Sequence, residues 1–144
     1  HAGITEGIGS EISRYRSQLQ AQDVKFFCDV NVKHGSHFIV SDRTPVELAH
    51  DAESEGAEVL IVTGFETGKA PTAERVRELT DAVTAPVLIG SGTTRENVVE
   101  LLQYADGAIV GSYFKLDNQW KMPVDEQVAR DFMDTVKEFR EGIR

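Results

Sequence analysis

One stretch of the sequence decides the fold: Val87-Leu88-Ile89-Gly90-Ser91-Gly92-Thr93-Thr94. A short apolar run opens into two glycines and three hydroxyl side chains, and a helical pattern follows from Arg95. A strand that passes into a helix through such a turn leaves backbone N–H groups free to face an anion. We therefore interpret the stretch as a strand, a phosphate-sized cradle and a helix.

A shorter version of the same pattern follows at Ala108-Ile109-Val110-Gly111-Ser112. Glycines at such positions are often only turn residues. The chain has two of these strand ends, Gly90-Ser91 and Gly111-Ser112, which we call the glycine–serine mouths, and two in succession favour a shared phosphate site. The spacing does not match the Gly-x-Gly-x-x-Gly dinucleotide fingerprint, so we assign no cofactor. The predicted phosphate-binding residues are Gly90, Ser91, Gly92, Thr93, Gly111 and Ser112.

The composition is that of an ordinary globular protein. The chain has 144 residues, 40% of them hydrophobic and 27% charged, and no apolar run approaches the ~20 residues of a membrane span. A net charge of −9 works against unspecific binding to nucleic acid or anionic lipid. The lone Cys28 suggests a small buried side chain and fits a reducing compartment, and no signal peptide is visible. We expect a cytoplasmic protein without a nucleic-acid partner or membrane insertion.

Strands and helices alternate along the chain. Thr44 and Glu47 have the spacing of a capping box around Pro45, and Gly56 ends that helix in a left-handed cap. Thr93 and Glu96 have the spacing of a second box. The expected strands are residues 24–33, 58–63, 87–89 and 107–111, and helices are expected to begin near Ser10, Thr44, Thr72, Thr93 and Pro123.

Short turns before the strands and long loops after them indicate a parallel sheet with right-handed crossovers. A doubly wound sheet and a (β/α) barrel both satisfy this pattern. Glycines at the ends of the last two strands favour the barrel, whose phosphate site commonly follows strands 7 and 8. We assign the chain to the α/β class, with parallel (β/α) units that correspond to strands 5–8 of a TIM barrel. A complete barrel takes ~250 residues, so residues 1–144 form a single domain that is the carboxyl-terminal half of one.

The first expected strand carries a polar face. Asp29, Asn31 and Lys33 are spaced by two, so they project on the same side toward the carboxyl end of the strand. A lysine among inward polar groups serves as acid, base or Schiff-base nucleophile when burial lowers its pKa, with Asp29 as its partner. We take these three as candidate catalytic residues, with a structural ion pair in the barrel interior as the alternative.

Further polar residues follow neighbouring strands. We predict that His34, Thr63, Gly64 and Thr67 contact the substrate, with Lys69 at the same mouth. His34 and His37 with Asp29 invite a metal interpretation, but neither their spacing nor a second cluster supports one, so we assign no metal. Large aromatics in a loop usually pack on a helix, so Tyr113 and Trp120 are left out of the site.

Five blocks of the sequence resemble the BtpA/SgcQ family, and the resemblance runs from Gly3 to Met133. It implies a TIM barrel of the ribulose-phosphate-binding kind, and cyanobacterial members are linked to accumulation of photosystem I reaction-centre proteins. Family members carry a further amino-terminal half with the first strands. The blocks are Asp29-Val30-Asn31-Val32-Lys33-His34, then Val62-Thr63-Gly64 with Thr67-Gly68, then Gly90-Ser91-Gly92-Thr93-Thr94-Arg95-Glu96-Asn97-Val98, then Ala105-Asp106-Gly107-Ala108-Ile109-Val110-Gly111-Ser112, and residues 118–125.

Two functions follow from these observations. The first is a protein that binds a small phosphorylated metabolite, with lyase- or isomerase-type chemistry. The second is a non-catalytic biogenesis or assembly factor that keeps a phosphate pocket and acts through protein contacts. Four βα units alone leave two sheet edges and an open apolar inner face, so we also expect a homo-oligomer or pairing with a missing amino-terminal half.

Overall fold

The computed structural model of the chain describes residues 7–30, 32, 41–64 and 69–142, and these form alternating helices and strands. The strands are β1 (Phe27–Val30), β2 (Val59–Val62), β3 (Val87–Ile89) and β4 (Gly107–Ala108). The helices are α1 (Gly9–Gln18), α2 (Pro45–Ser54), α3 (Ala73–Ala82), α4 (Val98–Leu101) and α5 (Glu126–Gly142), and two 3₁₀ turns are η1 (Ser112–Phe114) and η2 (Leu116–Asn118).

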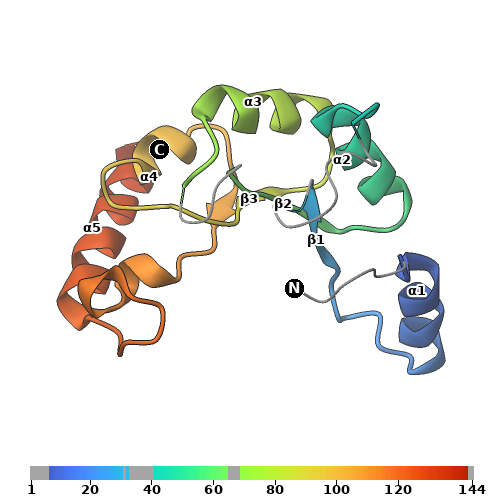
Figure 1. Cartoon of the computed structure of the whole chain (residues 1–144), viewed down its shortest axis with the longest axis horizontal. Helices are drawn as coiled ribbons and strands as arrows, with labels where there is room; N and C mark the ends of the chain where they lie inside the picture. Colours follow the sequence, from blue (N-terminus) through green and yellow to red (C-terminus); the bar gives the residue numbers. More distant parts are fainter. Residues whose placement is uncertain (1–6, 31, 33–40, 65–68, 143–144) are drawn as a thin grey trace.

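The four strands form one parallel sheet in the order β1-β2-β3-β4. Leu60 of β2 pairs with Cys28 of β1 on one side and with Val87 of β3 on the other. Figure 1 shows α2 and α3 along one face of this sheet, with α1 and α5 at its two ends. The α/β class with parallel strands, predicted from the alternation of helices and strands, is confirmed.

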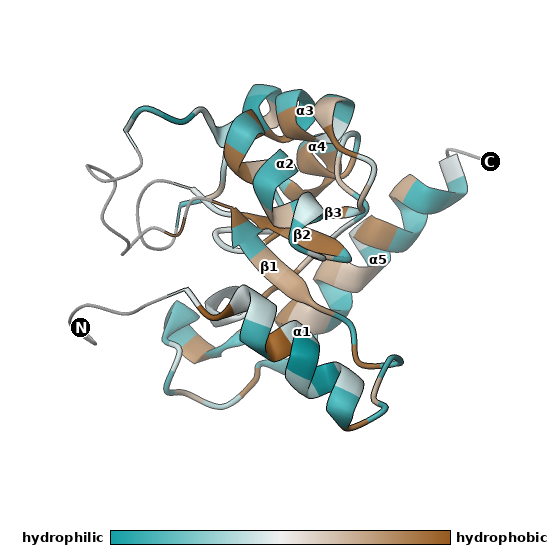
Figure 2. Ribbon diagram, turned by 90° about the vertical axis from the view of Figure 1, so that its right-hand side faces the viewer, coloured by the Kyte–Doolittle hydropathy of each residue, from teal (hydrophilic) through white to brown (hydrophobic). Residues whose placement is uncertain are grey.

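The core lies between the sheet and helices α2 and α3. Leu60, Val62 and Val87 point to this side and are buried against Ala49 of α2 and Leu79 of α3. Figure 2 shows the contrast between the apolar strands and the polar outer surface of the helices. Because parallel strands covered by helices are buried, β2 is a continuous apolar run, as its sequence indicates.

Two predicted helix signals have the expected geometry. The Thr44 hydroxyl accepts a hydrogen bond from the Glu47 amide, and the Glu47 carboxylate accepts one from the Thr44 amide, so the capping box forms with Pro45 behind it. Gly56 has φ +99°, the left-handed conformation that follows a helix end. The Thr72 hydroxyl caps α3 in the same way by accepting from the Arg75 amide.

Several predicted boundaries were wrong. The strand expected over residues 24–33 is limited in the described residues to Phe27–Val30, and the one expected over 107–111 to Gly107–Ala108. Helix α1 begins at Gly9 without a side-chain cap, so Ser10 is not its cap. Helix α5 begins at Glu126 rather than at Pro123, because the Asp125 carboxylate accepts from the amides of Gln127 and Val128 and fixes the start there.

Helix α1 is attached to the sheet by polar contacts. The Glu58 carboxylate accepts from the Arg16 guanidinium at 2.6 Å, the Lys25 ammonium at 2.9 Å and the Phe26 amide at 3.0 Å. The Arg16 guanidinium also lies 3.9 Å from the centre of the Phe26 ring. The large apolar side chains of this helix face outward, and Tyr15 is 62% exposed.

The lone cysteine lies on β1, and Cys28 is half-buried rather than fully buried. Burial raises the pKa of its thiol, and the nearby Asp29 carboxylate raises it further.

Within the described residues, no helix has the length and apolar character needed to cross a membrane.

Candidate functional site

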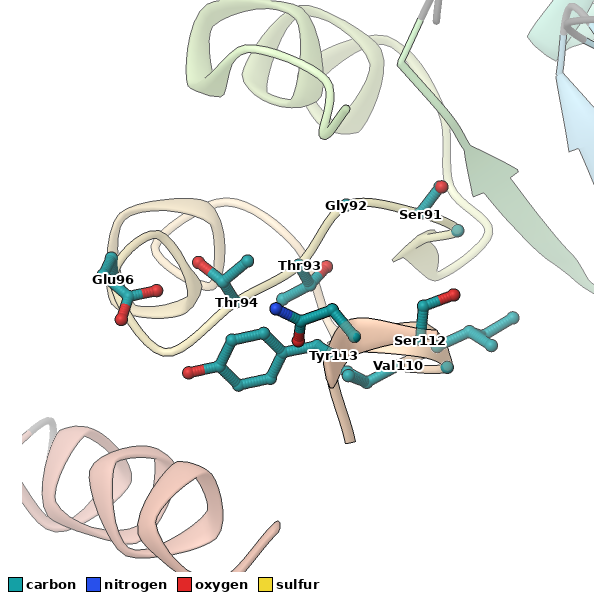
Figure 3. A pocket seen from close by; sticks show the side chains of 12 residues that line it. Ser91, Gly92, Thr93, Thr94, Glu96, Val110, Ser112 and Tyr113 are labelled. Carbon is teal, nitrogen blue, oxygen red and sulfur yellow. The ribbon is translucent and has the colours of Figure 1, made fainter. Parts of the chain in front are cut away.

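A pocket of about 780 Å³ lies between the loop that follows β3 and the segment that follows β4 (Figure 3). One wall consists of residues 90–94 with Glu96, and the other of residues 109–113 with Asn118. All six residues predicted to bind phosphate line this pocket. The structure therefore brings the two glycine–serine mouths of the sequence together.

The first wall is built on two glycines that packing requires. A Cβ at Gly90 would lie 2.5 Å from Cγ2 of Ile61 and 2.7 Å from Cγ2 of Thr63. Gly92 has φ +69°, and a Cβ there would lie 2.1 Å from the amide nitrogen of Ala70. Both positions need glycine whether or not a ligand is bound, so a purely structural role as turn residues explains these two glycines.

Asn97 holds the shape of the first wall. Its Oδ1 accepts from the Thr94 amide at 2.8 Å, and its Nδ2 donates to the Gly92 carbonyl at 3.0 Å. Helix α4 begins only at Val98 and has four residues. The predicted capping box between Thr93 and Glu96 was therefore wrong, and so short a helix provides no extended dipole for an anion.

Thr93 is the residue whose environment points most directly to a ligand. It is 2% exposed, yet its hydroxyl oxygen has no hydrogen-bond partner among the described residues. A buried hydroxyl without a partner costs about 1–3 kcal/mol. Figure 3 shows Thr93 between Gly92 and Thr94, on the wall that faces Val110 and Ser112.

The second wall is anchored by aromatic packing. The Tyr113 ring lies 5.9 Å from that of Phe132 in α5, and the Phe114 ring meets Phe132 edge-on at 5.0 Å. A Cβ at Gly111 would meet nothing within 4 Å, in contrast to Gly90 and Gly92. Gly111 thus has no packing reason to be glycine within the part of the chain that the structure describes.

The described lining of the pocket carries one ionisable acid and no Lys, Arg or His. The hydrogen bond from the Thr94 hydroxyl lowers the pKa of Glu96, so this carboxylate is anionic at neutral pH. The donors on this lining are backbone N–H groups, the hydroxyls of serine, threonine and tyrosine residues, and the side-chain amide of Asn118. Such donors hold phosphate through hydrogen bonds rather than through a charge pair.

The sequence pattern of the BtpA family matches residues 1–138. The chain belongs to the BtpA family. A mitochondrial protein of Caenorhabditis elegans, named as uncharacterized, is 38% identical over 134 residues, which are 93% of this chain and 48% of that protein. An uncharacterized protein of Thermococcus kodakarensis is 36% identical, covering 97% of this chain and 52% of its own length. The photosystem I biogenesis protein BtpA of Synechocystis is 32% identical, covering 94% and 47%. The chain thus spans about half the length of these relatives.

Two solved structures share the architecture of this BtpA-family chain. A thiamine phosphate pyrophosphorylase from Pyrococcus furiosus aligns with a TM-score of 0.53 and 19% identity, covering 94% of this chain and 81% of that one. GGGPS from Thermoplasma volcanium aligns with a TM-score of 0.59 and 13% identity, covering 91% and 56%. At these identities the likeness shows the fold alone, and it confirms the predicted βα units of TIM-barrel type.

The other predicted site residues of this BtpA-family chain are only partly described. Asp29 lies exposed on β1 and does not line the pocket. The hydroxyl of Thr63 is buried without a partner among the described residues, and Gly64 is buried against the backbone of residues 69–70. The positions outside the described residues are Asn31, Lys33, His34, His37 and Thr67. Within the described part of the chain, no three His, Cys, Asp or Glu side chains are placed to hold a metal ion.

Six of the lining residues were not among the predicted site residues: Thr94, Glu96, Ile109, Val110, Tyr113 and Asn118. Tyr113 packs on α5, as expected of a loop aromatic, and at the same time lines the pocket. Trp120, left out of the site for the same reason, is exposed and lies near Lys121. For Asn118 the residue type indicates a turn, because asparagine is one of the few residues that tolerate positive φ. The structure gives Asn118 a φ of +55°.

Proposed function

We propose that this chain forms the phosphate-binding end of a (β/α) barrel protein and holds a small phosphorylated metabolite between the loops after β3 and β4. The observation that carries the proposal concerns Thr93, a residue of the pocket lining, whose buried hydroxyl has no partner among the described residues. A phosphate oxygen is an acceptor that would satisfy it. The ligand then supplies the hydrogen bond that the folded chain leaves unmade.

The glycines support this proposal unequally. Gly90 and Gly92 are explained by packing alone, whereas Gly111 has open space where a side chain would stand. A missing side chain at Gly111 leaves the backbone of the second wall accessible to a ligand. The size of the pocket also suits a small organic molecule, since ligand sites usually enclose roughly 300–1,000 Å³.

Catalysis forms the second part of the proposal. Asp29, Asn31 and Lys33 are the proposed catalytic residues, and His34, Thr63, Gly64 and Thr67 the proposed substrate contacts. The chemistry proposed for them is of the lyase or isomerase type, with Lys33 as acid, base or nucleophile. A structurally similar protein named thiamine phosphate pyrophosphorylase supports the view that this fold serves enzymes with phosphorylated compounds.

A second candidate function comes from the similar Synechocystis protein, which is named as a photosystem I biogenesis protein. On that alternative the chain acts as an assembly factor through protein contacts. The two functions differ in what they require of the pocket, since an assembly factor needs no metabolite. A screen of phosphorylated metabolites separates them: saturable binding favours the first function, and no binding favours the second.

Thr93 provides the sharpest test of the proposed site. Thr93→Val keeps the shape of the side chain and removes the hydroxyl, whereas the control Thr93→Ser keeps the hydroxyl and removes the methyl group. We expect Thr93→Val to weaken binding of inorganic phosphate about tenfold or more, measured by calorimetric titration, with Thr93→Ser close to wild type. The free energy of unfolding of Thr93→Val should not fall, because the lost hydroxyl has no partner. Equal affinities in the three proteins would contradict the proposal.

A further inference from the structure

The loop of residues 115–124 turns back on itself beside the pocket. Its two ends are joined by an antiparallel bridge between Lys115 and Val124. The Leu116 amide donates to the Pro123 carbonyl at 3.0 Å, and the Asp125 amide closes the base by donating to the Phe114 carbonyl at 2.7 Å. Backbone hydrogen bonds therefore join the two ends of the loop.

In the first part of this loop, two successive residues have left-handed backbone conformations. Asp117 has φ +54° and Asn118 has φ +55°. For residues other than glycine this conformation costs roughly 1–2 kcal/mol, although asparagine and aspartate reach it more easily than others. The backbone amide of Asn118 donates to the Lys115 carbonyl at 3.0 Å, and this hydrogen bond fixes the turn. Of these two residues, only Asn118 lines the pocket.

The Asn118 side chain is exposed and makes no hydrogen bond to any residue that the structure describes, so it is available to a ligand in the pocket that it lines. Its amide offers two donors and one acceptor. The oxygens of a doubly ionised phosphate monoester only accept, so they use the donors of this side chain and leave its acceptor unused. A hydroxyl group on the rest of the ligand uses both, since it donates and accepts.

We infer that Asn118 is a specificity-determining residue that hydrogen-bonds a hydroxyl group on the carbon skeleton of the ligand. The ligand class is therefore a hydroxylated phosphate monoester, with its phosphate at Thr93 and its hydroxylated carbons toward Asn118. This inference rests on the proposed function, because it takes the phosphate position as given. The pocket volume of about 780 Å³ leaves room for both parts of such a ligand.

Asn118→Gly tests the inference without disturbing the backbone, because glycine adopts positive φ freely. Asp117→Gly is the matched control, since it makes the same change at the neighbouring left-handed residue outside the pocket. The probes are inorganic phosphate, n-propyl phosphate and glycerol 3-phosphate, and the last two share a three-carbon skeleton that differs in its hydroxyl groups. Calorimetric titration of the 144-residue chain gives the three affinities for each protein.

The wild-type chain should bind glycerol 3-phosphate more tightly than n-propyl phosphate, and Asn118→Gly should lose about tenfold in affinity for glycerol 3-phosphate alone. Asp117→Gly should leave all three affinities within about twofold of wild type. Equal loss for all three probes in Asn118→Gly, or no loss for any, would overturn the inference while the proposed function stands. A wild-type chain that binds none of the probes would overturn both.

Discussion

The side-chain amide of Asn97 donates a hydrogen bond of 3.0 Å to the carbonyl oxygen of Gly92. The same side chain accepts from the Thr94 amide at 2.8 Å, so one residue holds both flanks of Thr93. The backbone on both sides of Thr93 is thereby fixed before any ligand arrives. Such preorganisation is what allows backbone donors to bind an anion without a reordering cost.

We expect Asn97→Ala to lose both hydrogen bonds and therefore about 1–3 kcal/mol of unfolding free energy, measured by urea denaturation. Asn97→Asp keeps the acceptor for the Thr94 amide and loses the donor to Gly92, so its loss should be smaller. Both variants should bind inorganic phosphate more weakly than wild type. The exposed residue Gln103 provides a control in Gln103→Ala. Wild-type affinity in Asn97→Ala would show that this clamp does not shape the site.

The glycines of the two walls should respond differently to alanine. Gly92→Ala forces positive φ on a residue with a side chain and drives its Cβ against the Ala70 amide, so we expect a large loss of stability. Gly111→Ala should unfold like wild type, because its Cβ meets nothing within 4 Å. Its methyl group at the pocket wall should still weaken phosphate binding severalfold, as titration would reveal. A Gly111→Ala protein as unstable as Gly92→Ala would assign Gly111 to the fold rather than to the site.

The attachment of α1 should depend on pH. Hydrogen bonds lower the pKa of Glu58 from 4.5 to about 2. The largest contribution comes from the Lys25 side chain, followed by the Phe26 amide and the Arg16 side chain. A carboxyl with a depressed pKa in the folded state contributes stability that is complete above its unfolded pKa and is lost as the pH falls from about 4.5 toward 2. Glu58→Gln should therefore lower the melting temperature at pH 7, and the difference from wild type should shrink across that window. Glu55→Gln, at a nearby exposed position, is the control, and a pH-independent difference for Glu58→Gln would contradict this origin.

The apolar side chains left exposed on this half-length chain should drive association. Phe27 on the edge strand β1 is 52% exposed, and Tyr15 and Leu19 face outward from the α1 region. We propose that this surface pairs with a second copy or with an amino-terminal half of the barrel. Light scattering should show a species larger than one chain, and Phe27→Asp should shift it toward the monomer. A stable, well-behaved wild-type monomer would contradict the proposal.

The two predicted capping boxes show how far the sequence determines local structure. Both have the spacing Thr-x-x-Glu, and the first forms because Pro45 follows Thr44 and the box stands on the surface. At the second, Thr93 is buried in the pocket wall and the Asn97 side chain takes the Thr94 amide, so the helix starts later. Contacts from residues 69–70 hold Gly92 in place, and no local pattern reveals them.

The candidate site was predictable where it follows strand ends and not where it depends on loop closure. The two glycine–serine mouths converge because neighbouring parallel strands end at the same edge of the sheet. Asn118 joins them only through the bridge between Lys115 and Val124, a long-range pairing within an irregular loop. Tyr113 reaches the pocket because Phe132 of α5 fixes its ring, which requires knowledge of how α5 packs.

The most direct test of the central claim is a titration of the isotopically labelled chain with inorganic phosphate, followed by amide NMR. We predict saturable shifts at the amides of Gly92, Thr93 and Ser112, because these residues line the pocket. Amides around Arg16 and Lys25, which lie beside Glu58 away from the pocket, should stay unchanged. Saturable shifts confined to the amides around Arg16 and Lys25, or no saturable shift at all, would contradict the proposal that the pocket binds phosphate.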